Sequence, residues 1–147
     1  MRNTMRRMTL ALWLLALPAG AGSALACGVG DMSPAGYEVA TLSHAYTHWE
    51  QGTASPIPFL FVDVRTPAEY RAGHVPGAVN IPVDELANRL NEVPRNRQVY
   101  VYCEAGVRAA RAGKLLAAKG FNNIEVVPAS MRGWRDAGYP VKKGEQP

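Results

Sequence analysis

The sequence predicts a small single α/β domain with a central, mainly parallel sheet and helices on both faces. Two observations lead to this fold class. Between residues 37 and 141, short β-prone segments alternate with segments of helical periodicity, and this alternation is typical of parallel sheets linked by helical crossovers. Two of the β-prone segments, "FLFVDV" (59–64) and "QVYVYC" (98–103), are nearly continuous apolar runs, which indicates strands covered on both faces.

The first half of the chain predicts a strand, a helix, a strand, a helical turn and a strand. "YEVAT" (37–41) is a short β-prone segment. Residues 42–52 place four apolar side chains on one helical face and end at a glycine. The long apolar strand at 59–64 is followed by a short helical turn at 67–72 and a brief strand, "AVNI" (78–81).

The second half continues the alternation. "VDELANRLNEV" (83–93) has apolar residues one turn apart and predicts an amphipathic helix. The strand at 98–103 is followed by an Ala-rich helix at 105–120 that ends at a glycine. "NIEVVP" (123–128) predicts a third central strand, and a last helix is expected near residues 130–138.

The N-terminus has the pattern of a secretory signal peptide. Three arginines precede the apolar run "LALWLLALPAGAGSALA" (10–26), which closes on an A-x-A cleavage site at Ala24–Ala26. A retained membrane anchor is the alternative, but Pro18 and Gly20 interrupt the apolar run well short of the ~20 residues that a span requires. We therefore expect residues 1–26 to be removed and the protein to be exported to the periplasm.

Cys27 directly follows the cleavage site, and this position leaves two further alternatives open. The first is a lipid anchor at Cys27, although the lipid-attachment box normally has Leu at the position that Ala24 occupies. The second is a disulfide between Cys27 and Cys103, the two cysteines of the chain. Residues 27–36 are rich in Gly and Pro, so we expect an N-terminal tail before the domain.

The charge of the chain gives little support for a nucleic-acid partner. The chain has 16 Lys and Arg residues against 12 Asp and Glu residues, and its pI is near 9.3. Three of these basic residues, Arg2, Arg6 and Arg7, belong to the leader, so the remaining chain is almost neutral. A nucleic-acid surface would need a clustered basic patch, and we expect none.

Cys103 occupies the place where ligands bind in open α/β sheets, which is the carboxyl end of a central strand. The helix that begins just after Cys103 directs unpaired amide hydrogens and its positive dipole end toward the sulfur, and this favours the nucleophilic thiolate. Gly106 permits a tight loop, and Arg108 supplies a cation at its end. A buried, inert cysteine is the alternative.

Three sequence segments resemble the rhodanese family of sulfurtransferases. They are "DVRTPAEYRAGHVPGAVNIP" (63–82), "CEAGVR" (103–108) and "GWRDAGYPV" (133–141). The likeness extends over residues 37–141, which implies a single rhodanese-like domain there and a short C-terminal tail at 142–147.

The resemblance implies a persulfide cycle on Cys103. The thiolate would take a sulfane sulfur from a donor such as thiosulfate and pass it to a thiophilic acceptor such as cyanide or a thiol. The implied partners are these small molecules, with a redox or sulfur-carrier protein as a further partner, and no metal or organic cofactor is expected. The implied substrate-binding residues are those of the cysteine loop and one arginine upstream, namely Glu104, Ala105, Gly106, Val107, Arg108 and Arg65.

The length of the cysteine loop distinguishes this reading from related phosphatases and arsenate reductases, whose loop is one residue longer. Four residues separate Cys103 from Arg108, as in sulfur-transfer domains. Two positions differ from the usual family pattern: Glu104 places a carboxylate next to the cysteine, and Ala129-Ser130 stand where two glycines are common. A non-catalytic rhodanese-like module that carries sulfur or binds a partner is the alternative function.

Overall fold

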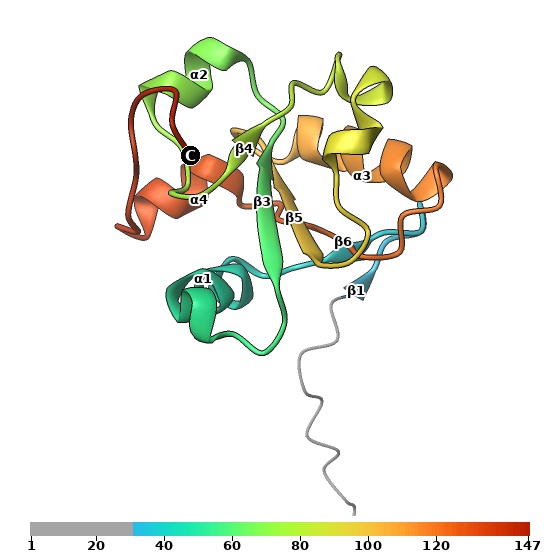
Figure 1. Cartoon of the computed structure of the whole chain (residues 1–147), viewed down its shortest axis with the longest axis horizontal. Helices are drawn as coiled ribbons and strands as arrows, with labels where there is room; N and C mark the ends of the chain where they lie inside the picture. The colour runs from blue at the N-terminus through green and yellow to red at the C-terminus, as the bar shows by residue number, and fades with distance from the viewer. Residues whose placement is uncertain (1–30) are drawn as a thin grey trace, which may run out of the picture.

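The protein is described from a computed structural model, in which residues 31–147 are placed. Its centre is a six-stranded sheet with the order β1-β2-β6-β5-β3-β4 (Figure 1). Only the β1–β2 pair is antiparallel, and the other four pairs are parallel. The predicted fold class is therefore confirmed, whereas the predicted leader and Cys27 lie outside the described residues. The strands are β1 (Asp31–Met32), β2 (Glu38–Val39), β3 (Phe59–Asp63), β4 (Val79–Asn80), β5 (Gln98–Tyr102) and β6 (Ile124–Val126).

Helices cover both faces of this sheet (Figure 1). The helix α3 packs on one face, together with two short 3-10 turns, and α1, α2 and α4 lie on the other. Among residues 31–147, none of the helices is both long enough and apolar enough to cross a bilayer. The helices are α1 (Leu42–Gln51), α2 (Pro67–Ala72), α3 (Val107–Ala118) and α4 (Ser130–Asp136), and the 3-10 turns are η1 (Gly52–Ala54), η2 (Leu86–Asn88) and η3 (Leu90–Glu92).

The central strand β5 shows how the sequence fills both layers. Its side chains alternate between the faces, as in any strand. Val99 and Val101 join the core under α3, whereas Tyr100 and Tyr102 join the core under α1 and α4. All four side chains are buried. The nearly continuous apolar run therefore reflects a strand that is covered on both sides, as predicted.

The two helices before the cysteine loop begin at polar caps. Thr41 accepts a hydrogen bond from the amide of His44 and starts α1. Thr66 and Glu69 form a reciprocal capping box around Pro67, which starts α2. These local bonds explain why both helices begin where the sequence predicts.

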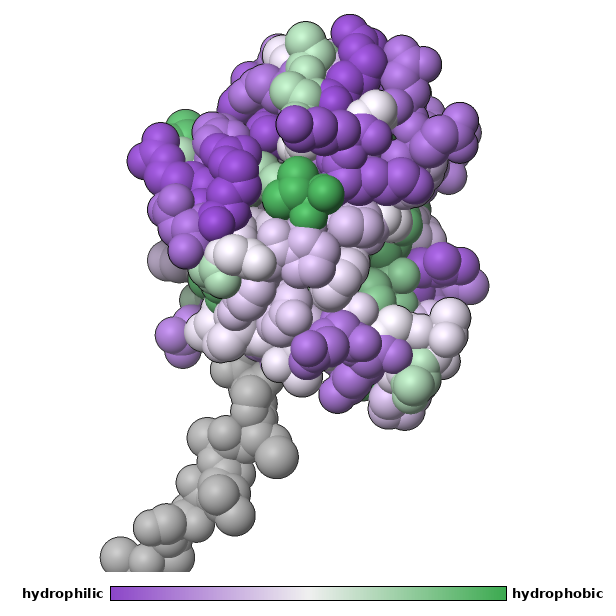
Figure 2. All heavy atoms as spheres, turned by 90° about the vertical axis from the view of Figure 1, so that its left-hand side faces the viewer, coloured by the Kyte–Doolittle hydropathy of each residue, from purple (hydrophilic) through white to green (hydrophobic). Residues whose placement is uncertain are grey.

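Aromatic side chains join α1 to α4 and to the C-terminal segment. Tyr46 stacks on Tyr139 with the ring centroids 3.7 Å apart, and Trp134 contacts Tyr46, Trp49 and Tyr139 edge-on. Figure 2 views this side of the molecule, which is strongly hydrophilic over its upper part and paler over its middle and lower part. The aromatic contacts fix the position of α4, whose first residues reach the cysteine loop.

The predicted amphipathic helix at residues 83–93 is wrong. This segment instead forms the two 3-10 turns η2 and η3, which are separated by Arg89. Val83 donates its amide to the carbonyl of Val64 at 3.1 Å, so the start of the segment is bound to the residue that follows β3 and forms a turn rather than a helix. Arg89 then binds both Glu85 and Glu92, and these ion pairs stabilise the local turns.

Both expected tails contain ordered contacts. Residues 31–36 of the expected N-terminal tail belong to a hairpin: β1 pairs with β2 through a turn in which the amide of Ser33 donates to the carbonyl of Tyr37 at 2.8 Å, and Gly36 has a φ of +85°. This hairpin was not predicted from the sequence. At the other end, His74 and Lys142 exchange two backbone hydrogen bonds of 2.9 Å. The C-terminal residues therefore lie against the loop that follows α2.

Gly113 on α3 provides a test of the packing between α3 and the sheet. A Cβ atom at this position would lie 2.6 Å from Val126 Cγ2 and 3.0 Å from the Tyr37 ring. We expect Gly113→Ala to lower the free energy of unfolding by about 1–3 kcal/mol through overpacking, although alanine is the better helix former. Urea denaturation measures the change, and Lys114→Ala on the exposed side of α3 is the matched control. An unchanged or raised stability in Gly113→Ala would contradict the close packing.

Candidate active site

The candidate site is built around Cys103, which directly follows β5 and precedes α3. Gly106 closes the loop with a φ of +94°, a conformation that L side chains rarely adopt. A Cβ atom at Gly106 would also lie 2.6 Å from the carbonyl oxygen of Pro128. Backbone geometry and close contact with the β6–α4 segment therefore both require glycine at this position.

The sulfur of Cys103 points into this loop. The amide of Gly106 donates a hydrogen bond to Sγ at 3.1 Å, and the hydroxyl of Ser130 lies 3.8 Å from the same atom. Cys103 is 1% exposed. The loop thus holds the sulfur at the N-terminal end of α3, where backbone amides favour a negatively charged atom.

The first residues of α4 contact the cysteine loop through hydrogen bonds. The amide of Cys103 donates to Ser130 Oγ at 3.1 Å, and the amide of Met131 donates to the carbonyl of Cys103 at 2.9 Å. The amide of Arg132 donates to the carbonyl of Glu104 at 3.0 Å. Sequence reasoning did not identify Ser130 as a contact of the cysteine, although the departure from two glycines at Ala129-Ser130 marked the position.

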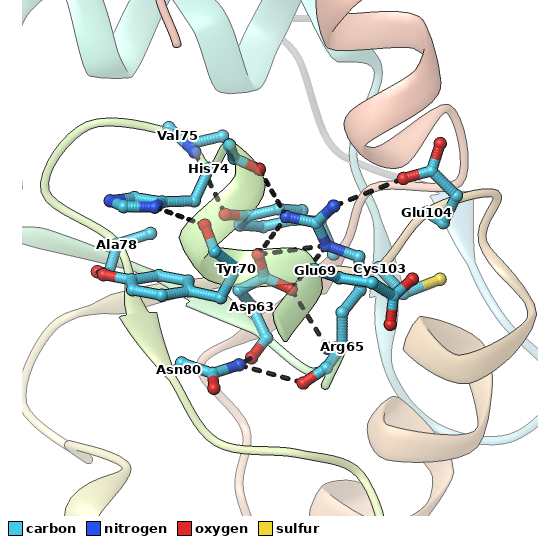
Figure 3. Close-up of polar contacts among 12 residues, drawn as sticks. Asp63, Arg65, Glu69, Tyr70, His74, Val75, Ala78, Asn80, Cys103 and Glu104 are labelled. Atoms are coloured by element: carbon cyan, nitrogen blue, oxygen red, sulfur yellow. Dashed lines mark hydrogen bonds and ion pairs between the residues drawn. The ribbon is translucent and has the colours of Figure 1, made fainter. Parts of the chain in front are cut away.

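A buried ion pair lies next to the loop, at the end of β3 (Figure 3). Arg65 binds the carboxylate of Asp63 through Nε and Nη2, the shortest contact being 2.6 Å, and also donates to the carbonyl of Gly73 at 2.7 Å. Burial alone would lower the pKa of Arg65, but the hydrogen bonds and charge of Asp63 raise it above its usual value. Arg65 is therefore held as a cation.

Glu104 is bound by two arginines. Its Oε2 accepts a hydrogen bond from Arg65 Nη1 at 3.3 Å, and its Oε1 binds the guanidinium of Arg135 on α4. Figure 3 shows the carboxylate turned toward Arg65 and away from the sulfur of Cys103. The carboxylate that the sequence places next to the cysteine is therefore paired with two arginines, and it links the cysteine loop to Arg65 after β3 and to Arg135 on α4.

Arg108 is also paired. Its two terminal nitrogens each bind one carboxylate oxygen of Glu69 on α2 at 2.8 Å. The hydrogen bond from Arg108 is the main cause that lowers the pKa of Glu69 to about 2, and the cap bonds from Thr66 act in the same direction. The cation that the sequence places at the mouth of the loop is therefore present, but a carboxylate offsets its charge.

The family comparison agrees with this geometry. The rhodanese-like domain family matches residues 41–137, which include the four strands β3 to β6 and the whole cysteine loop. The chain belongs to the rhodanese-like domain family.

Sulfurtransferases are among the relatives of this rhodanese-like domain. It is 33% identical over 82 residues to a sulfurtransferase of Allochromatium vinosum, covering 56% of this chain and 77% of the relative. It is 37% identical over 86 residues to the thiosulfate sulfurtransferase PspE of Escherichia coli, covering 57% of this chain and 79% of the relative. A helix-turn-helix transcriptional regulator of Mycobacterium tuberculosis is 42% identical over 85 residues, but the chain spans only 37% of its length.

Solved structures show the same fold. A rhodanese-related protein from Thermoplasma volcanium superposes with a TM-score of 0.64 at 28% identity, covering 72% of this chain and 98% of that protein. The protein CoADR-RHD of Bacillus anthracis gives a TM-score of 0.56 at 31% identity, covering 65% of this chain and 16% of that protein. The matched fold thus makes up nearly the whole of one of these chains and a small part of the other.

Within this rhodanese-like domain, the structure brings most of the expected site residues together. Glu104, Gly106 and Arg108 lie in the loop with Cys103, and Ala105 and Val107 are exposed on its outer side, Val107 at 81%. Arg65 is 2% exposed and lies beside the loop rather than on its surface. Direct contact of these side chains with substrate stays a prediction. Among residues 31–147 there is no cluster of three metal-ligating side chains.

The ion pair between Glu69 and Arg108 predicts a specific dependence of stability on pH. The pKa of Glu69 is lowered from 4.5 to about 2, so the pair stabilises the fold at pH above 4.5, and this contribution is lost as the pH falls toward 2. Both side chains are one-third exposed, so we expect Glu69→Gln to cost about 0.5–1 kcal/mol at pH 6 and much less near pH 2.

Urea denaturation of the wild type and Glu69→Gln at a series of pH values measures this difference. Arg108→Gln is the matched control: in its background, Glu69→Gln should lose most of its pH-dependent effect, because the partner is absent. A difference between the two proteins that does not change with pH would contradict the assignment.

Proposed function

We propose that this rhodanese-like domain is a sulfurtransferase that carries a sulfane sulfur on Cys103 as a persulfide. The observation that supports this most directly is the position of Sγ: Cys103 directly follows the central strand β5, and Sγ accepts the amide hydrogen of Gly106 at 3.1 Å at the start of α3. Such a site stabilises an anionic sulfur without a metal ion or a general base.

The loading step is a displacement at sulfur. The Cys103 thiolate attacks the outer sulfur of thiosulfate, a new bond forms between Sγ and that sulfur, and the bond to the sulfonate sulfur breaks. Sulfite leaves with the bonding electron pair, and Cys103 holds a persulfide anion. The first intrahelical bond of α3 runs from the amide of Ala110 to the carbonyl of Gly106. The amides of residues 107–109 therefore have no partner inside the helix and are suited to bind the terminal sulfur.

The discharge step regenerates the thiolate. A nucleophile such as cyanide attacks the outer sulfur, the bond between the two sulfurs breaks, and the electron pair returns to Sγ. Thiocyanate leaves, and no net oxidation of the protein occurs. Histidine is not needed for either step, and His74 is buried, with Nδ1 hydrogen-bonded to the carbonyl of Tyr70 at 2.8 Å.

Relatives support both the enzymatic and the carrier reading of this chemistry. Two are named sulfurtransferases, and the one from Escherichia coli is named for thiosulfate. A third, 37% identical over 73 residues, is a putative sulfur carrier protein of Bacillus subtilis, of which the chain covers 40%. An enzyme and a sulfur carrier would both form a persulfide, so repeated turnover with a small acceptor distinguishes the enzyme from the carrier.

Mass spectrometry of the purified protein tests the proposal. After incubation with thiosulfate, we expect a mass increase of about 32 Da, one sulfur atom, on the peptide that contains Cys103. Cyanide should remove this mass and release thiocyanate. Cys103→Ser should fold normally but form no adduct and no thiocyanate, because serine has no sulfur to accept the group.

Wild-type protein whose thiols have been alkylated beforehand is the matched control for Cys103→Ser. Thiocyanate formation that survives in the serine variant would refute the role of Cys103. A wild-type protein that forms no adduct with thiosulfate would instead favour the partner-binding module.

We also propose that the protein acts outside the inner membrane. The support is the leader pattern of residues 1–26, which ends at Ala24–Ala26. Intact-mass measurement of the protein recovered from the periplasmic fraction should show a chain that starts at Cys27. An additional mass of a diacylglycerol group would establish the lipid-anchored form, and a full-length chain that retains the leader would contradict processing.

A further inference from the structure

Ser130, the first residue of α4, has a backbone conformation that serine rarely adopts. It is the one non-glycine residue with a positive φ among residues 31–147, and its φ is +53°. Glycine takes this conformation without strain, whereas a residue with a Cβ atom does not. Ser130 is also 2% exposed. A strained, buried serine next to the cysteine indicates that its side chain has a role that glycine could not perform.

The hydroxyl of Ser130 lies between three groups of the cysteine site. Oγ accepts the amide hydrogen of Cys103 at 3.1 Å and donates its own hydrogen to the carbonyl of Val127 at 2.8 Å. It also lies 3.8 Å from Sγ of Cys103. Because a hydroxyl has one hydrogen, it can serve either the Val127 carbonyl or the sulfur, and rotation about the C–O bond exchanges the two acceptors while Oγ keeps the amide of Cys103.

We propose that Ser130 is a catalytic residue for the discharge of the persulfide: its hydroxyl keeps its proton and donates a hydrogen bond to Sγ as the bond between the two sulfurs breaks. This inference rests on the proposed function. In the persulfide, the negative charge lies mainly on the outer sulfur, and Sγ needs no second donor. When the acceptor takes the outer sulfur, the charge returns to Sγ, and the hydroxyl and the amide of Gly106 can then stabilise it together.

This assignment predicts that the two half-reactions respond differently to loss of the hydroxyl. Stabilisation of Sγ as a leaving group accelerates discharge, because the charge is larger in the transition state than in the persulfide. In loading, the thiolate is the reactant, so the same stabilisation lowers its energy before the attack and gives little net acceleration. Ser130 should therefore matter more for discharge than for loading.

Two substitutions separate this chemical role from a structural one. Both Ser130→Gly and Ser130→Ala remove the hydroxyl, but only glycine also relieves the backbone strain at φ +53°. We expect the midpoint temperature of thermal unfolding to be lower for Ser130→Ala than for Ser130→Gly. The rate of discharge, in contrast, should fall about tenfold in both variants. Ser55→Ala is the matched control, because Ser55 Oγ likewise binds a backbone amide and a backbone carbonyl, both of Ile57, and it lies outside the cysteine loop.

Single-turnover measurements give the two rates separately. Loading is followed as sulfite release from thiosulfate, and discharge as thiocyanate release from protein that has been loaded beforehand. The inference is supported if both Ser130 variants load within about threefold of the wild type and discharge about tenfold more slowly, while Ser55→Ala does neither.

The inference would be overturned if Ser130→Gly discharged the persulfide as fast as the wild type. It would also be overturned if the discharge rates of the variants fell in proportion to their thermal stability. If Ser130→Ala does not fold, Ser130→Gly decides the question alone. A wild type that forms no persulfide would overturn the proposed function together with this inference, so the two failures are distinguished by the wild-type protein itself.

Discussion

The arrangement of the site depends on the buried ion pair between Asp63 and Arg65. Asp63 ends the central strand β3 and is fully buried, so its carboxylate requires the guanidinium of Arg65 as a partner. Arg65 in turn binds the carbonyl of Gly73 after α2 and the carboxylate of Glu104 in the cysteine loop. Loss of either member would leave an unpaired buried charge, at a cost of about 3–5 kcal/mol. One ion pair thus connects β3, α2 and the loop that carries Cys103.

Charges around the loop are largely balanced. Three carboxylates, those of Asp63, Glu69 and Glu104, bind the guanidinium groups of Arg65, Arg108 and Arg135. The positive charges of the arginine side chains at this site are therefore mostly neutralised by carboxylates. The electrostatic support for an anionic sulfur comes instead from backbone amides, which are fixed by the fold and do not reorganise during a reaction. This explains why the conformation of Gly106 and the contacts of Ser130 matter for the site.

Much of the fold follows from local sequence patterns, and the contacts of the site mostly do not. The apolar runs at β3 and β5, the capping box of α2 and the strand-end position of Cys103 can be read directly, because each depends on neighbouring residues. The 3-10 turns η2 and η3 could not, since the bond from Val83 to Val64 joins separate parts of the chain. The partners of Glu104 and Arg108 are 31 to 39 residues away, and no spacing rule identifies them.

The two outer strands of the sheet have a consequence for how the protein behaves in solution. A sheet edge exposes unpaired backbone groups, and a long, flat edge invites pairing with another chain. Here β1 and β4 form the edges, and each is only two residues long. The long apolar strands β3 and β5, which would be the most prone to pair with another chain if exposed, lie inside the sheet. The short outer strands therefore limit edge-to-edge aggregation of a domain whose core strands are strongly β-prone.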